Sequence, residues 1–187
     1  MNISQQHVGL VVVTAGMVGL FWVWWPMLTN KAEEPVHARE SCRVLFVYDG
    51  DTIGCDLNKN GKIEKPGEEI RLLGIDTPEM HYSRKNKSHG SKKPVDEPFA
   101  KEASMLTENL TGKKTVYLEY DLERHDPYGR TLAYVYLSTD DPKSMGELLL
   151  EKGYAKTLFL GENRRLANEY YEAEESARQQ RLGLWSD

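Results

Sequence analysis

The sequence predicts a small closed β-barrel with helices attached to it, preceded by a separate apolar segment. Segments rich in β-branched and aromatic residues, divided by turn signals, occupy most of residues 43–137, and one helical segment interrupts them. Strands and helices do not alternate along the chain, so a parallel α/β sheet is not expected. The apolar segment, residues 8–28, contains no charged residue, and its 21 residues are about the number that a membrane-spanning helix needs.

The N-terminal region is expected to comprise a tail, residues 1–7, a membrane anchor, residues 8–28, and a polar linker, residues 29–41. A cleaved signal peptide is the alternative to the anchor. No Lys or Arg precedes the apolar segment, and the Trp-Trp-Pro-Met sequence near its end lacks the small residues that a cleavage site needs. We therefore expect an uncleaved, single-pass transmembrane helix.

One globular domain, residues 42–187, is expected to follow the linker. The formal net charge of −5 argues against a broad basic surface for nucleic acid, so any phosphate binding must be local. The two cysteines, Cys42 and Cys55, flank a predicted hairpin. The turn that we expect at residues 49–52 would place Cys55 opposite Phe46, so the sequence leaves open whether the cysteines form a disulfide.

The elements of the domain follow from turn signals, residue composition and helical spacing. The expected strands are 43–48, a return strand that starts at Thr52, 69–75, 115–120 and 131–137. The expected helices begin near Pro98, Ser144 and Asn163, and they end near Gly112, Gly153 and Gly183. Ser144 and Glu147 form a capping box for the second helix, and Asn163 is expected to cap the third. Five strands interrupted by a single helix favour a small closed barrel.

The segment 71–79, Arg-Leu-Leu-Gly-Ile-Asp-Thr-Pro-Glu, places an arginine and two acids at the end of an apolar strand. Pro78 is expected to end the strand. On a straight strand Arg71 and Asp76 would face opposite sides of the sheet, so Gly74 must supply a bend if both belong to one site. An arginine beside two acids indicates either an ion-pair cluster or a site for a metal ion and a phosphate.

The polar insertion between the second and third strands resembles the start of an EF-hand calcium loop. Oxygen-bearing side chains stand at its first, third, fifth and ninth positions, which are Asp56, Asn58, Asn60 and Glu64. The sixth position is Gly61, as in that loop, but the twelfth is Gly67 instead of the usual glutamate. The sequence therefore suggests a second, structural calcium site, and a polar turn without metal is the alternative.

Four motifs, in this order, together resemble the staphylococcal nuclease (thermonuclease) family. These motifs are Asp49-Gly-Asp-Thr52, Arg71–Glu79, Tyr128-Gly-Arg130 and Gly183-Leu-Trp185. The resemblance covers residues 42–186, nearly the whole globular part. It implies an OB-fold, which is a five-stranded barrel with three helices, and calcium-dependent hydrolysis of DNA and RNA.

The resemblance also implies a calcium site. The carboxylates of Asp51 and Asp76 and the backbone carbonyl of Thr77 would bind Ca²⁺, a hard cation that prefers oxygen ligands. Taken singly, these residues have structural interpretations: Asp51 as a turn former after Gly50, and Asp76 as the partner of Arg71 in an ion pair. Their joint occurrence favours the metal site.

The same resemblance implies the catalytic residues. Arg71 and Arg130 would hold the scissile phosphate, because a guanidinium is planar, permanently charged and able to bind two phosphate oxygens. Glu79 would position or deprotonate the attacking water, since calcium by itself does little to lower the pKa of its water.

Substrate contacts are expected from an aromatic pair and from a basic loop. By the resemblance, Tyr128 would lie beside the bound nucleotide. Family members often carry two tyrosines after the Ala-Lys pair, whereas Phe159 and Gly161 stand here, so base stacking is retained and the hydroxyl groups are lost. Lys85 and Lys87 would guide a polyanion to the site, or they belong to a solvated surface loop. We expect a monomer that prefers single-stranded or unpaired DNA and RNA.

Two observations oppose each other on the side of the membrane where the domain lies. Lys31, Arg39 and Arg43 follow the apolar segment, and the positive-inside rule would then place the domain in the cytoplasm. Calcium is plentiful outside the cell and a cytoplasmic nuclease would threaten it, so we expect an extracytoplasmic domain, or a secreted one if the apolar segment is cleaved. A membrane-tethered module that only binds nucleic acid or protein is the alternative to an enzyme.

Overall fold

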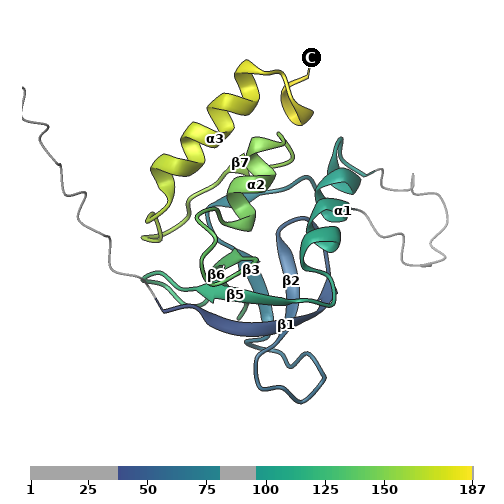
Figure 1. The fold of residues 1–187 in the computed structure, drawn as a ribbon, viewed down its shortest axis with the longest axis vertical. Coiled ribbons are helices and arrows are strands. Elements are labelled where there is room, and N and C mark those ends of the chain that lie inside the picture. The colour runs from purple at the N-terminus through teal and green to yellow at the C-terminus, as the bar shows by residue number, and fades with distance from the viewer. Residues whose placement is uncertain (1–37, 81–95, 187) are drawn as a thin grey trace, which may run out of the picture. The chain divides into compact units, whose positions relative to one another are not determined.

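The computed structural model describes residues 38–80 and 96–186, which form a closed five-stranded barrel (Figure 1). Its strands are β1 Glu40–Val47, β2 Thr52–Asp56, β3 Glu69–Leu72, β5 Thr115–Glu119 and β6 Thr131–Tyr136. Their order around the barrel is β1, β2, β3, β6 and β5. Neighbouring strands are antiparallel except for β3 and β6, which run parallel. The predicted barrel is confirmed, and each expected strand overlaps an observed one.

The expected strand 69–75 is interrupted at Gly74, whose φ of 77° lies in the left-handed region that favours glycine. β3 therefore ends at Leu72, and the chain turns into a separate strand, β4 Ile75–Asp76. β4 pairs with β7 Lys156–Thr157 in a second, two-stranded sheet. The predicted bend at Gly74 is confirmed. The second sheet was not predicted, because a strand of two residues has no alternating pattern to detect.

Besides the strands, the described residues form three α-helices and one short 3₁₀-helix (Figure 1). They are α1 Ala100–Thr111, α2 Met145–Glu151, α3 Ala167–Gln179 and the 3₁₀-helix η1 Gly183–Trp185. The hydroxyl of Ser144 accepts a hydrogen bond from the backbone N–H of Glu147, so the predicted cap of α2 is confirmed. The predicted cap Asn163 is wrong. α3 begins at Ala167, and the Asn163 side chain instead binds the backbone of Glu123.

A continuous apolar core extends from the barrel interior into the contact between α2 and α3. Inside the barrel the fully buried side chains include Val44, Ile53, Ile70, Val116 and Leu118. The helices add Met145, Leu149, Leu150 and Tyr170. The buried hydroxyl of Tyr170 has a hydrogen-bond partner, since it lies 2.6 Å from Ser144 Oγ. The segments on both sides of residue 74 therefore pack on this core.

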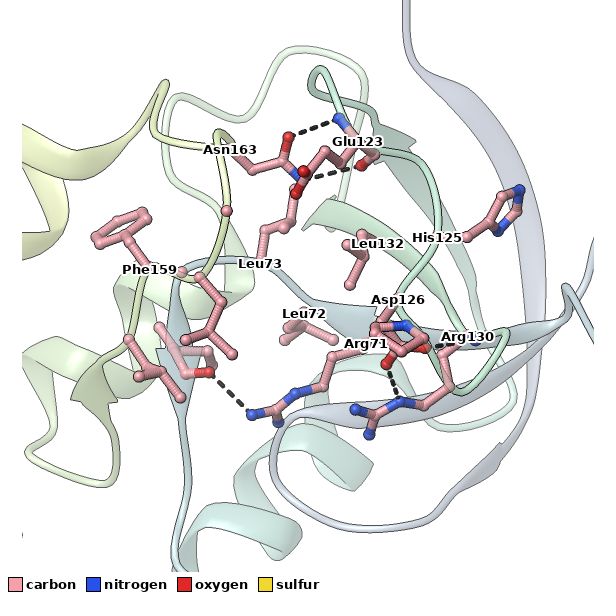
Figure 2. Close-up of a pocket in the computed structure, with 16 residues that line it drawn as sticks. Arg71, Leu72, Leu73, Glu123, His125, Asp126, Arg130, Leu132, Phe159 and Asn163 are labelled. Carbon is pink, nitrogen blue, oxygen red and sulfur yellow. Dashed lines mark hydrogen bonds and ion pairs between the residues drawn. The ribbon is translucent and has the colours of Figure 1, made fainter.

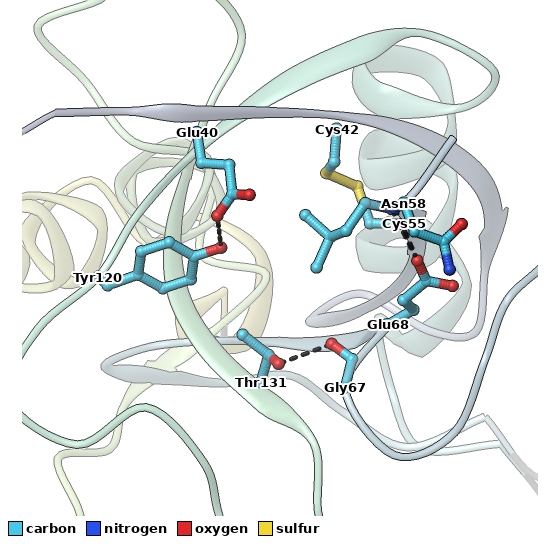
Figure 3. Close-up of a disulfide and its surroundings, with 9 residues drawn as sticks. Glu40, Cys42, Cys55, Asn58, Gly67, Glu68, Tyr120 and Thr131 are labelled. Carbon is cyan, nitrogen blue, oxygen red and sulfur yellow. Dashed lines mark hydrogen bonds between the residues drawn. A yellow bond between two sulfur atoms is a disulfide. The ribbon is translucent and has the colours of Figure 1, made fainter. Parts of the chain in front are cut away.

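Cys42 and Cys55 form a buried disulfide between β1 and β2, with their Cα atoms 5.7 Å apart (Figure 3). The expected strand register is wrong, because Cys55 lies opposite Val44 and not opposite Phe46. Phe46 lies opposite Gly54, one position away from the expected register, and β1 carries an irregularity between Val44 and Phe46. Cys42 and Cys55 thus become diagonal neighbours, close enough to bond.

No helix within residues 38–80 and 96–186 is both long and apolar enough to span a membrane. The expected tail, the anchor 8–28 and most of the linker lie outside the described residues. Lys85 and Lys87 also lie outside them. The structure therefore describes the globular domain alone.

Candidate active site

Asp51 lies in the turn between β1 and β2 and is buried, with 4% of its surface exposed. Its Oδ2 accepts hydrogen bonds from the backbone N–H and the hydroxyl of Thr77, at 2.8 and 2.9 Å. The backbone N–H of Asp51 donates to Asp49 Oδ1 at 3.1 Å, so Asp49 shapes the turn. Gly50 allows a close approach, because a Cβ atom there would lie 2.8 Å from Thr77 and Ala103. The fold itself therefore fixes the Asp51 carboxylate.

Arg71 on β3 joins the two aspartates that the sequence proposes as metal ligands. Its guanidinium forms an ion pair with Asp51, and Nη2 donates a hydrogen bond to Asp76 Oδ1 at 2.8 Å. This arrangement depends on the bend at Gly74, since Asp76 would otherwise face the opposite side of the strand. Burial lowers the pKa of Arg71 and the charge of Asp76 opposes that shift, but a guanidinium remains protonated in proteins.

Arg130 is held by a turn at residues 126–130. Asp126 Oδ1 accepts hydrogen bonds from the backbone N–H groups of Tyr128 and Arg130, both at 2.9 Å, and Asp126 Oδ2 accepts one from Arg130 Nε at 2.6 Å. Burial alone would raise the pKa of Asp126, but its hydrogen bonds with Arg130 outweigh this effect and lower the pKa. Figure 2 shows the guanidinium groups of Arg71 and Arg130 side by side. Two neighbouring guanidinium groups suit a phosphate.

Glu79 lies exposed at the end of the 71–79 segment. Its backbone is tied to Glu97, whose carboxylate accepts the Glu79 N–H at 3.2 Å. Among the described residues, none forms a hydrogen bond or ion pair with the Glu79 carboxylate, which is therefore open to water. The structure brings together five of the expected residues, which are Asp51, Arg71, Asp76, Thr77 and Arg130.

The carboxylates of Asp51 and Asp76 converge on one cationic group, the guanidinium of Arg71. They are therefore close enough to share a cation, and carboxylate oxygens are ligands that Ca²⁺ prefers. Within the described ranges of the chain, no three His, Cys, Asp or Glu side chains form a group that could hold a metal ion. The donor set is thus a pair of carboxylates, which fits calcium binding completed by a backbone carbonyl and water but lacks the nitrogen and sulfur ligands of zinc.

A cavity of about 560 Å³ opens beside the two arginines (Figure 2). Its apolar wall consists of Leu72, Leu73, Leu132, Leu158 and Phe159. Phe159, which we expected to stack on a base, packs against Tyr170 with the ring centroids 5.9 Å apart. Tyr128 is 85% exposed, and its ring centroid lies 5.6 Å from the guanidinium carbon of Arg130. Tyr128 is thus the ring next to Arg130, whereas the Phe159 ring packs against α3.

Sequence reasoning missed two polar residues that line this cavity, Glu123 and Asn163. Asn163 Oδ1 accepts the backbone N–H of Glu123 at 2.8 Å, and Asn163 Nδ2 donates to the Glu123 carbonyl at 2.9 Å. The two residues are 40 positions apart, so no local pattern indicates their pairing. The sequence indicates only a turn at residues 126–130, and it gives no sign that Asp126 holds the Arg130 side chain.

The insertion between β2 and β3 gathers the four residues of the EF-hand-like pattern in one loop. The Asp56 carboxylate accepts the backbone N–H groups of Asn60 and Gly61 at 3.0 and 2.9 Å. The Glu64 carboxylate accepts hydrogen bonds from the side-chain amides of Asn58 and Asn60 at 3.1 and 2.7 Å. The four side chains therefore belong to one hydrogen-bonded loop, in which Glu64 binds the amide groups of both asparagines.

Buried Glu68, one position after the expected twelfth ligand, closes this loop (Figure 3). Its carboxylate accepts three backbone N–H groups, which belong to Leu57, Asn58 and Glu64. The Thr131 hydroxyl donates to the Gly67 carbonyl at 2.6 Å, and this bond connects the loop to β6 next to Arg130. The loop is thus ordered by its own acids and attached to the strand that follows the arginine turn.

The fold is a closed five-stranded barrel of the OB-like class, and its paired guanidinium groups beside converging carboxylates have the chemistry that suits a phosphate. The sequence model of the family described as "Staphylococcal nuclease homologue" matches residues 69–187. The chain is 34% identical over 148 residues to the thermonuclease of Staphylococcus hyicus, covering 79% of this chain and 77% of that protein. It is 36% identical over 146 residues to the thermonuclease of Staphylococcus intermedius, covering 78% and 76%. Endonuclease YncB of Bacillus subtilis is 34% identical over 166 residues, covering 84% and 69%. The chain therefore belongs to the staphylococcal nuclease homologue family.

Proposed function

We propose that this protein is a Ca²⁺-dependent nuclease that hydrolyses phosphodiester bonds of DNA and RNA. The observation that carries the proposal is the pair of guanidinium groups, one on β3 and one on the 126–130 turn, beside the carboxylates of Asp51 and Asp76. Phosphodiester hydrolysis builds negative charge on the phosphoryl oxygens, and such a group of cations and cation ligands stabilises it. The relatives named thermonuclease and endonuclease support the same activity.

Each residue has a role that its chemistry allows. Arg71 and Arg130 bind the non-bridging phosphate oxygens, and their charge is worth most in the transition state. Calcium held by Asp51, Asp76 and the Thr77 carbonyl would supply further positive charge next to the phosphate. The carboxylates that would hold calcium are those that now contact Arg71, so Arg71 would turn from them to the phosphate.

Glu79 accepts the proton of the attacking water. The water oxygen forms a bond with phosphorus in line with the bond that breaks, and the leaving 5′-oxygen takes a proton from solvent. The resemblance to the family implies that the products carry 3′-phosphate ends. The exposed position of Glu79 supports this role because its carboxylate is open to water.

We also propose that the domain works outside the cytoplasm, attached by residues 8–28. The buried Cys42–Cys55 disulfide supports this location, since disulfides persist in oxidising compartments and are rare in the cytosol. Protease treatment of intact cells tests the location. Digestion of the domain without lysis is expected, and protection until lysis would contradict the proposal.

A second calcium ion in the loop 56–68 is a further part of the proposed function. The grouping of Asp56, Asn58, Asn60 and Glu64 supports it, as does the attachment of the loop to β6. Its role would be structural, because the loop holds no group that reaches the two arginines.

A nuclease assay tests the main proposal. Single-stranded DNA and RNA are incubated with the protein in calcium, in EGTA, and with the variant Arg130→Ala. Degradation in calcium alone is expected, with a loss of at least about 100-fold in the variant, the size of effect that removing one preorganised charge-stabilising group has. Binding of DNA without any degradation would show a binding module instead of an enzyme.

A further inference from the structure

The cavity beside the arginines has a polar group at each end and an apolar wall between them (Figure 2). Arg71 and Arg130 lie at one end, and Glu123 and Asn163 lie at the other. The wall between them is formed by Leu72, Leu73, Leu132 and Phe159. A nucleotide has the same order of groups: a charged phosphate, then the faces of an apolar base, then a polar base edge. The cavity of about 560 Å³ has room for one such unit.

Glu123 is fixed at its backbone and unpaired at its carboxylate. Both backbone polar groups of Glu123 bond to the side chain of Asn163, which is only 1% exposed. Within the described parts of the chain, no residue donates a hydrogen bond to the Glu123 carboxylate or forms an ion pair with it. The carboxylate is therefore an acceptor on a fixed backbone, and a ligand in the cavity can bind it without displacing another described residue.

Gly161 provides the space for this carboxylate. Its φ of 69° is in the region that favours glycine, and a Cβ atom at this position would collide with Glu123 Oε2. The carboxylate thus lies against the backbone of the loop that carries Phe159. It lines the cavity at the end opposite Arg71 and Arg130.

A carboxylate at that point distinguishes among the four bases. It accepts hydrogen bonds and donates none, and its two oxygens match two neighbouring N–H donors. Guanine presents such a pair, N1–H and N2–H, on its Watson–Crick edge. Adenine and cytosine place an acceptor nitrogen beside their amino group, and the single N–H of thymine or uracil lies between two carbonyl oxygens. Those acceptors would face the carboxylate and repel it.

We propose that Glu123 makes the site selective for guanine in the nucleotide whose phosphate lies on Arg71 and Arg130. The inference rests on the proposed nuclease function. The base packs on the apolar wall, and its N1–H and N2–H donate to the two oxygens of Glu123.

Cleavage mapping tests the selectivity. Single-stranded DNA and RNA of random sequence are digested to low extent by the wild type, by Glu123→Gln and by the control Glu162→Gln. Glu162 follows Gly161 in the neighbouring loop, and its exposed side chain does not line the cavity. The wild type and the control are expected to favour guanine at one position by about tenfold or more, the size of effect that a bidentate base contact gives. Glu123→Gln should reduce this preference to about twofold. An unbiased wild type, or a preference that survives in Glu123→Gln, overturns the inference.

A binding measurement separates this inference from the activity itself. Calorimetry compares guanosine 5′-monophosphate with uridine 5′-monophosphate on the wild type and on Glu123→Gln. Preference for guanosine monophosphate that is lost in the variant supports the guanine site even if no cleavage occurs, and the nuclease proposal alone then fails. Cleavage without any preference for guanine overturns the guanine site and leaves the nuclease proposal standing.

Discussion

Replacing Asp126 with asparagine should show how much catalysis depends on the position of the Arg130 guanidinium, because the charge of Arg130 is kept. Asp126 accepts one hydrogen bond from Arg130 Nε at 2.6 Å and two from backbone N–H groups of its own turn. Asparagine has nearly the same shape and keeps one carbonyl oxygen, so it can keep the two backbone bonds through Oδ1. It loses the charged acceptor that faces Nε. A hydrogen bond to a charged group contributes about 1.5–3 kcal/mol.

If that energy is lost mainly in the transition state, kcat falls by about 10- to 150-fold. The KM for a single-stranded oligonucleotide should change little, because Arg130 keeps its charge. The assay is steady-state hydrolysis in saturating calcium, accompanied by thermal unfolding of the same samples. Asp140→Asn is the matched control, since Asp140 is exposed and lies after β6, outside the site.

An unchanged kcat in Asp126→Asn would refute the reasoning. A loss of kcat that only follows unfolding at the assay temperature would refute it too. A normal kcat in Asp140→Asn together with a folded, slow Asp126→Asn would assign the loss to the position of one guanidinium.

Three further predictions concern stability at low pH, stability after reduction of the disulfide, and calcium binding by the loop 56–68. The folded pKa of Asp126 lies below the ordinary value of about 3.9, so its pairing stabilises the protein above that pH, and this contribution is lost as the pH falls through the lower folded value. Urea unfolding should therefore show the wild type and Asp126→Asn converging below about pH 4, and a constant difference would contradict this. Reducing Cys42–Cys55, which closes a separation of 13 residues, should cost about 3 kcal/mol in the free energy of unfolding, and no change on reduction would exclude that contribution. In an Asp76→Ala, Glu79→Ala variant, calorimetry should find one calcium site that Asp56→Ala removes, and finding none would exclude the second ion.

The elements that a short stretch of sequence encodes were predictable. The alternation of β1 and β6 and the capping box at Ser144 depend on residues within one or two turns of each other. The bend at Gly74 was predictable for another reason. Asp76 and Arg71 belong to one site only if the strand bends between them, and Gly74 is the glycine that lies there.

Residues whose role depends on a distant partner were not predictable. Asn163 looks like a helix cap, but its donors and acceptors are satisfied by Glu123, 40 positions away. The predicted register of β1 and β2 was wrong for the same reason, because the irregularity in β1 depends on how the whole barrel closes. Arg71, Arg130 and the aspartates were found by their likeness to a family motif. Asp126 lies just before the Tyr128-Gly-Arg130 motif, and its role becomes visible only in its three hydrogen bonds.

Because β3 pairs in parallel with β6, the barrel cannot close until β6 has been synthesised. The residues of the proposed site are therefore completed in a fixed order. Asp51, Arg71 and Asp76 all precede β5, which ends at Glu119, whereas Arg130 and the strand that closes the barrel come afterwards. A chain that has been made only through β5 can form the first hairpin and its disulfide, but it has neither the second guanidinium nor a closed barrel. For the proposed nuclease, the phosphate-binding pair of arginines is therefore incomplete until β6 has been synthesised.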